Sequence, residues 1–204
     1  MIAVRDNDRY FTPEEYFAWE EQQLEKHELI DGHVYTMSGG TQNHSAIAIN
    51  FLLLITPHLR GSRCNVFNSD LKVKILNSSN YTYPDLSVTC DDRDRENAIY
   101  ITYPCLIIEV LSNSTEAYDR GKKFEKYRRN PNLIDYVLVS SEEIAIDIYH
   151  RNDAREWMIL SYRSGDRVEL KSIDLSLPIE QFYEEIVFEV IRWFGPVSLL
   201  RIYP

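Results

Sequence analysis

The apolar run CLIIEVLS at residues 105–112 is the feature that most restricts how this chain can fold. Its density of branched apolar residues is typical of a β-strand that is covered on both faces. Glu109 stands in the middle of the run, where an ionised carboxylate is costly unless it is paired or binds a cation. We therefore expect a cationic partner for Glu109.

The flanking segments predict a mixed sheet packed against helices, an α/β or α+β fold. Thr12, Pro13 and Glu15 form a strong helix-start signature, and Asp31-Gly32 between alternating apolar residues indicates a hairpin. The N-terminal part is thus a helix followed by a hairpin. We expect helices at 12–25, 43–59, 116–129 and after Pro178, a hairpin at 27–37, strands near 64–69, 71–76, 82–90 and 105–111, and a C-terminal antiparallel meander formed by 133–140, 144–151, 156–163 and 167–172.

The chain of 204 residues and 24.0 kDa, with 44% hydrophobic residues, can bury one sizeable core, so we expect a single domain over 1–204. Its longest apolar run, at 46–55, is too short to span a bilayer, which predicts a soluble, cytoplasmic protein with no membrane partner. The formal charge of -10 argues against binding nucleic acid by bulk electrostatics. Any such contact has to be local, and only RGKKFEKYRR at 120–129 is strongly basic, although basic helix faces are usually just solvated.

Three cysteines occur, at positions 64, 90 and 105. Their number is odd, they lie in strand-like segments, and they form no CxxC pair. We therefore expect neither a disulfide nor a zinc site and interpret all three as small core residues.

Two carboxylates lie on successive predicted strands. Asp85 follows Pro84 at the start of one strand, and Glu109 lies on a later one. If these strands are neighbours, the two carboxylates converge at one sheet edge, and a divalent cation such as Mg²⁺ would relieve their repulsion. In the following helix, Asp119, Lys122, Lys123 and Lys126 share one face. An ordinary turn residue and buried or helical ion pairs explain the same residues equally simply.

With these residues the chain resembles the Uma2 family (DUF820) of restriction-endonuclease-like proteins, common in cyanobacteria, within the PD-(D/E)XK nuclease superfamily. The resemblance runs from about 12 to 188 and leaves the tail 189–204 unassigned. It implies a nuclease core with a mixed sheet flanked by helices. The segments that carry it are HELIDGHVYTMSGGTQNH at 27–44, YPDLSV at 83–88, PCLIIEVLSNST at 104–115 and YDRGKKFEKYRRNPNLIDYVLV at 118–139.

The resemblance implies that Asp85 and Glu109 are catalytic carboxylates that bind Mg²⁺ or Mn²⁺, with Glu28 as a further metal ligand. The superfamily motif expects a lysine two residues after the acid, but Leu111 occupies that position. The resemblance implies that the matching ammonium comes from the next helix, where Lys123 occupies the family position and Lys122 is the competitor.

Three further residues are supporting candidates. Asp119 could orient Lys123 instead of binding metal. Tyr127 could hold that lysine, although packing is the commoner role of a helix aromatic. His44 could approach phosphate, and helix capping or packing explains it as well.

The predicted activity is metal-dependent hydrolysis of DNA phosphodiester bonds by metal-activated water. The alternatives are a nuclease-fold module that binds nucleic acid or protein without cutting, and a hydrolase of RNA or another phosphate ester. We also expect a homodimer, because two sites are needed to cut two strands.

Overall fold

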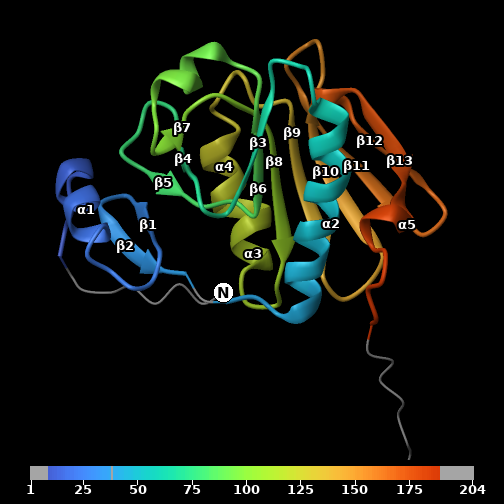
Figure 1. Cartoon of the computed structure of the whole chain (residues 1–204), viewed down its shortest axis with the longest axis horizontal. Helices are drawn as coiled ribbons and strands as arrows, with labels where there is room; N and C mark the ends of the chain where they lie inside the picture. Colours follow the sequence, from blue (N-terminus) through green and yellow to red (C-terminus); the bar gives the residue numbers. More distant parts are fainter. Residues whose placement is uncertain (1–8, 38, 189–204) are drawn as a thin grey trace, which may run out of the picture.

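The structure, a computed structural model, describes residues 9–37 and 39–188. Its main sheet has six strands in the order β11-β10-β9-β8-β6-β3 (Figure 1). The neighbours β8 and β9 run parallel, and the other neighbouring pairs run antiparallel. The strands are β3 (Asn65–Asn68), β6 (Leu86–Thr89), β8 (Pro104–Leu111), β9 (Asp135–Ser140), β10 (Ala145–Arg151) and β11 (Trp157–Arg163).

A second sheet, in the order β2-β1-β5-β4-β7, carries the predicted hairpin. Asp31 and Gly32 form its turn with positive φ angles of 51° and 81°. A Cβ atom at Gly32 would collide with the ring of Tyr10, so glycine is required there. The strands are β1 (His27–Ile30), β2 (His33–Thr36), β4 (Lys72–Lys74), β5 (Tyr81–Thr82) and β7 (Tyr100–Ile101).

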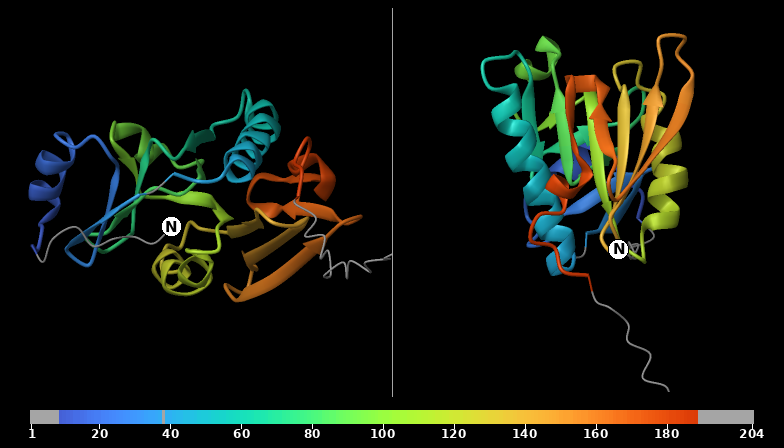
Figure 2. Two further views of the ribbon diagram at one scale, coloured as in Figure 1. Left: turned by 90° about the horizontal axis from the view of Figure 1, so that it is seen from below. Right: turned by 90° about the vertical axis from the view of Figure 1, so that its right-hand side faces the viewer.

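Helices cover both faces of the six-stranded sheet (Figure 2). Leu106 and Ile108 of β8 belong to the core that includes α2, whereas Ile107 and Leu111 pack in the core that contains Phe124 of α4. The apolar run is therefore a strand buried on both faces, as predicted. The helical segments are α1 (Pro13–Glu20), α2 (Gln42–Leu59), η1 (Asp92–Glu96), α3 (Glu116–Tyr118), η2 (Asp119–Lys123), α4 (Phe124–Tyr127), η3 (Lys171–Ile173) and α5 (Ile179–Phe182).

The predicted N-terminal helix exists but is shorter than 12–25. The backbone N–H of Glu15 donates to Thr12 Oγ1, and the Glu15 carboxylate accepts from Thr12 N, so the predicted capping box is confirmed. The helix ends at Glu20, whose carboxylate accepts a hydrogen bond from His27 N at 2.9 Å. This bond draws the following turn back to the start of β1.

The C-terminal part differs from the predicted meander. Only β9, β10 and β11 follow each other antiparallel, whereas β12 (Arg167–Leu170) pairs with β13 (Leu175–Pro178) in a separate hairpin. Val168 and Leu170 are buried in the main core, so β12 covers the sheet instead of extending its edge. The last helix spans only Ile179–Phe182, because the chain turns immediately afterwards and Glu185 has a φ of 60°.

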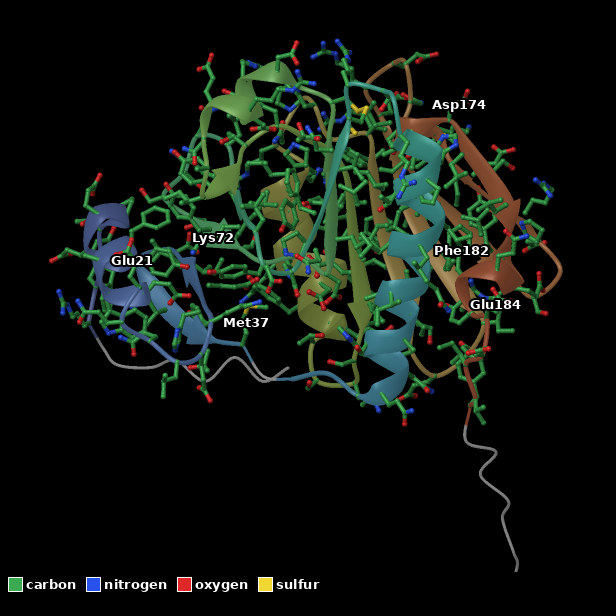
Figure 3. All side chains as sticks on the ribbon, in the orientation of Figure 1. Glu21, Met37, Lys72, Asp174, Phe182 and Glu184 are labelled. Carbon is green, nitrogen blue, oxygen red and sulfur yellow. A yellow bond between two sulfur atoms is a disulfide. The ribbon has the colours of Figure 1, made fainter. Side chains whose placement is uncertain are left out.

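The interpretation of the three cysteines was wrong for two of them. Cys64 and Cys90 form a disulfide, visible as the yellow bond in Figure 3, and only Cys105 is a free, buried thiol. The cause is strand register: β3 and β6 pair antiparallel with Asn65 opposite Thr89, so the next pair outward is Cys64 and Cys90. Twenty-six positions separate them, and only the sheet brings them together.

The tail 189–204 lies outside the described residues, and the single-domain prediction for 1–204 stays a prediction. Within residues 9–37 and 39–188, no helix is long and apolar enough to cross a membrane. The predicted fold class is confirmed: the chain is a mixed α+β protein whose sheets are flanked by helices.

Candidate active site

A cleft of about 1800 Å³ opens where the carboxyl end of β8 meets the starts of α2 and α3. Its lining includes Glu28, Asp85 and Glu109, together with Asp119 and Lys123. Figure 2, left, looks from below along these chain ends, with α2 on one side of the strands and the α3–α4 helix on the other. Residues that are far apart in sequence therefore share one cavity.

Asp85 and Glu109 are neighbours across two strands, as the sequence suggested they could be. In the antiparallel pair of β6 and β8, Leu86 faces Ile108, so one step along the register Asp85 faces Glu109. The backbone N–H of Val110 donates to Asp85 Oδ2 at 2.7 Å. This bond holds the Asp85 carboxylate against the strand that carries Glu109.

Lys123 is the cationic partner of Glu109. Its Nζ atom lies 2.7 Å from Glu109 Oε1, and the two side chains are only 7% and 6% exposed. The pair does not have hydrogen-bond orientation, so this buried Oε1 lacks a donor among the described residues. Burial, with Asp119 and Asp85 nearby, raises the pKa of Glu109 well above its ordinary value, and the Lys123 charge only partly opposes this.

Two more carboxylates approach the same ammonium. Lys123 Nζ lies 3.6 Å from Glu28 Oε1 and 3.7 Å from Asp119 Oδ1. Glu28 is held by the backbone N–H of Tyr83, which donates to its Oε1 at 3.0 Å. Burial opposes the charge of Lys123, but Glu109, Glu28 and Asp119 outweigh it and raise the pKa of the ammonium well above its ordinary value. One buried cation thus faces an excess of carboxylates.

A π-helical turn at Asp119–Lys123 interrupts the predicted helix between α3 and α4. Such turns insert an extra residue into a helix and occur frequently at functional sites. Here the turn contains both Asp119 and Lys123, which point into the buried cluster. Helix periodicity alone did not reveal this turn.

His44 lies at the start of α2 and reaches Asp85. Its Nε2 atom is 3.3 Å from Asp85 Oδ2, and its backbone N–H donates to Thr41 Oγ1, which caps the helix. Burial disfavours protonation of His44, but the hydrogen bond and charge of Asp85 outweigh burial and raise its pKa above the ordinary value. The side chain therefore joins the cleft, while the capping role belongs to Thr41.

The two remaining candidates lie at the margin of the cluster. Lys122 lines the cleft but forms no ion pair with a described residue. Tyr127 is 1% exposed, and its hydroxyl lies 2.5 Å from Thr82 Oγ1, while its ring packs against Tyr136. The structure brings Tyr127 into the core beneath the site, not into the cleft.

Sequence reasoning missed Tyr118, which also lines the cleft. Burial and the neighbouring charge of Glu28 raise the pKa of its phenol, so the hydroxyl is kept protonated as a hydrogen-bond donor. The only signal in the sequence was its place one residue before Asp119.

The donor chemistry of the cleft fits a hard divalent cation. Carboxylate oxygens are the preferred protein ligands of Mg²⁺, which usually takes one or two of them and keeps several waters. Glu109 Oε1 is buried and lies 2.7 Å from the Lys123 ammonium but has no hydrogen-bond donor among the described residues, so its lone pairs can still serve a metal ion. Within that part of the chain, no three acidic, histidine or cysteine side chains are placed so that they could hold a metal ion together. The residues therefore suit a water-rich Mg²⁺ site rather than an all-protein one.

Fold and cleft together define a nuclease-like protein. A solved structure from Anabaena variabilis ATCC 29413, described as "a putative nuclease belonging to DUF820", matches with a TM-score of 0.71 at 18% identity and covers 87% of this chain and 99% of that one. At that identity the match establishes the fold alone. The match to the Uma2 family model, "Putative restriction endonuclease", extends over residues 13–180, and the chain belongs to that family.

Relatives of high similarity come from the cyanobacterium Synechocystis sp. (strain ATCC 27184 / PCC 6803 / Kazusa). The uncharacterized protein slr1290 is 55% identical over 177 residues, which cover 87% of this chain and 93% of the relative. The uncharacterized protein sll1609 is 31% identical over 172 residues, with coverage of 83% and 97%. The chain therefore spans nearly the whole length of both relatives.

Proposed function

We propose that this protein is a divalent-metal-dependent endonuclease that hydrolyses phosphodiester bonds of DNA in the cleft at the end of β8. The observation that carries the proposal is the buried cluster in which Lys123 Nζ lies within 4 Å of Glu109, Glu28 and Asp119. Membership of the Uma2 family supports a nuclease over other uses of such a cluster.

Asp85 and Glu109 are the proposed ligands of the cation, Mg²⁺ or Mn²⁺, with Glu28 as a further candidate. When bound, the ion supplies Lewis-acid polarisation of the phosphate and a lowered pKa for water. Val110 N–H and Tyr83 N–H, which donate to Asp85 and Glu28, fix the direction of these carboxylates before substrate arrives. Pre-oriented ligands reduce the reorganisation needed in the reaction.

Lys123 is the proposed source of positive charge for the reacting phosphate. Its ammonium has three N–H groups that can donate hydrogen bonds. The acceptors would be phosphate oxygens that gain negative charge in the transition state, or an attacking water. Asp119 lies one helical turn before Lys123 and would position the ammonium rather than contact substrate. We assign this role to Lys123 rather than Lys122 because only Lys123 contacts the carboxylates.

The test combines metal titration with plasmid cleavage. Calorimetric titration with Mg²⁺ or Mn²⁺ should show binding to the wild type and much weaker binding to Asp85→Asn, which keeps the shape of the side chain. The wild type should nick supercoiled plasmid in the same buffer, and Asp85→Asn should not. Asp70→Asn is a matched control, because Asp70 is an exposed carboxylate outside the cleft. Equal cleavage by wild type and Asp85→Asn would refute the site.

A second candidate is a nuclease-fold module that binds without cutting, which the net charge of -10 favours because it disfavours extended phosphate contact. Metal binding without plasmid nicking would support that module, or a hydrolase of RNA or another phosphate ester. With DNA as its substrate, the protein would act in the cytoplasm. A two-fold homodimer would supply one cleft for each strand, and light scattering of the purified protein tests it.

A further inference from the structure

Three basic side chains form a row beside the carboxylate cluster. Lys122, Lys126 and Arg129 are spaced four and three residues apart, so they follow one face of the helix and of the turn after it. All three line the cleft. We call them the basic row. They belong to the basic segment 120–129, which the catalytic proposal uses only through Lys123.

The basic row is largely free to meet an anion. Lys122 and Arg129 are exposed and form no ion pair with a described residue, and Lys126 pairs with the exposed turn residue Asp31 at 2.7 Å. Glu125 does not neutralise the row, because its carboxylate contacts Arg128 Nη1 at 3.1 Å. Positive charge thus remains available along this wall.

The wall of the cleft formed by α2 has the opposite character. This helix contains no Asp, Glu, Lys or Arg in its 18 residues. Ala48, Ile49 and Leu52 line the cleft, and Ile49 is 51% exposed, although an apolar side chain of this size is usually buried. Apart from His44, whose ring pairs with Asp85, the α2 wall offers apolar surface and no lysine or arginine for a phosphate.

The two walls flank the ends of the strands from opposite sides (Figure 2, left). The basic row extends about 10 Å along the helix, at about 1.5 Å per residue. Along one strand of a stacked duplex the phosphates advance by about 3.4 Å each, and an unstacked strand is more extended. The row is therefore long enough to contact consecutive phosphates of one strand.

We propose that the cleft binds its substrate as a single DNA strand, with the phosphates on Lys122, Lys126 and Arg129 and the unstacked bases against Ile49 and Leu52 of α2. A duplex would bring a second phosphate backbone towards a wall that has no lysine or arginine to receive it. Single-strand sites commonly combine a positive groove with aromatic side chains on which the bases stack, and here the aliphatic side chains of Ile49 and Leu52 would take that place. The inference rests on the proposed nuclease function, because it assumes that the substrate is DNA.

Binding measured without metal tests the inference independently of cleavage. Fluorescence anisotropy in EDTA would compare a labelled 20-nucleotide strand with the duplex of the same sequence, using the full chain. The wild type should bind the strand more tightly than the duplex. The double variant Lys122→Gln/Arg129→Gln should bind the strand about tenfold more weakly, and the slope of log affinity against log salt should fall by about 1.4, for two lost contacts.

Matched controls use exposed residues outside the cleft. Arg155→Gln/Lys171→Gln removes the same two charges and should leave strand binding unchanged. Ile49→Gln should weaken strand binding, whereas Ile159→Gln, on the edge strand β11 and 65% exposed, should not. Circular dichroism and melting temperature verify that each variant is folded.

The possible results separate the two proposals. Equal or tighter duplex binding, or a Lys122→Gln/Arg129→Gln variant that binds like its charge-matched control, would overturn the single-strand inference even if plasmid is cleaved. Strand-selective binding that depends on the basic row and on Ile49 would support it even if no cleavage is found, in which case only the nuclease proposal fails.

Discussion

Lys123 Nζ lies 2.7 Å from Oε1 of Glu109, and both side chains are almost completely buried. Lys123 is the cationic partner that we expected for Glu109 from the apolar run, because an ionised carboxylate in a buried strand needs a nearby cation. The resemblance led us to compare the position two residues after the acid, but this is Leu111, which is buried in the core. The ammonium therefore approaches Glu109 from another element.

Removing Lys123 should destabilise the protein strongly. Lys123→Ala leaves Glu109 buried without its counter-ion, which we expect to lower the free energy of unfolding by about 3–5 kcal/mol at pH 7. Urea denaturation measures this change. Lys122→Ala, one residue away but exposed, should change it by less than about 0.5 kcal/mol. Equal effects of the two variants would contradict the ion pair.

The defect of Lys123→Ala should depend on pH in a defined direction. The pKa of Glu109 is already raised well above its ordinary value, and loss of the ammonium raises it further. The folded variant then holds a proton that the unfolded chain releases above about pH 4.3. The loss of unfolding free energy relative to wild type should therefore be smallest below that pH and should grow as the pH rises. Unfolding curves from pH 4 to 8 test this, and a deficit that grows on acidification would refute it.

Tyr127 should matter for stability and not for activity. Tyr127→Phe removes the hydroxyl that lies 2.5 Å from Thr82 Oγ1 in the core, at an expected cost of about 1 kcal/mol. Cleavage by the folded variant should equal that of wild type. A large loss of cleavage with unchanged stability would instead place the Tyr127 hydroxyl in the reaction.

The disulfide between Cys64 and Cys90 can be tested by counting the reactive thiols of the purified protein. Protein purified in air and then unfolded without reductant should show one reactive thiol, and three after reduction. The folded protein should show none at pH 8, because burial raises the pKa of Cys105 to about 12. Three thiols without reductant would mean that Cys64 and Cys90 are not joined.

The same disulfide should contribute to stability. Cys64→Ser opens a covalent loop between positions 26 residues apart, at an expected cost of about 3 kcal/mol. Cys105→Ala is the matched control, since it removes a cysteine and leaves the bridge. Treating the wild type with reductant should reproduce the effect of Cys64→Ser and have no effect on Cys64→Ser itself.

The N-terminal cap can be tested by one substitution. Thr12→Ala removes the oxygen that accepts from Glu15 N and should cost about 1 kcal/mol in urea denaturation. Glu14→Ala, in the same helical turn but outside the capping box, should cost less than half as much. Equal costs would contradict a specific contribution of the capping box.

The elements that the sequence predicted well are those encoded by neighbouring residues. The capping box at Thr12, the Asp31-Gly32 turn and the apolar run around Glu109 each follow from a few adjacent side chains whose steric and hydrogen-bonding preferences act locally. The mixed sheet followed from the order of such segments. Spacing indicated Asp85, Glu109 and the helix face of Lys123, and the family resemblance added Glu28 and the preference for Lys123 over Lys122.

Tertiary structure decided which of these residues meet. Strand register places Asp85 opposite Glu109 and joins Cys64 to Cys90, and a π turn sends Lys123, not Lys122, to the carboxylates. Register and helix rotation depend on how whole elements pack, because a shift of one residue reverses the face on which a side chain lies. The sequence by itself therefore determined the elements and their chemistry, and packing determined which side chains share the cleft.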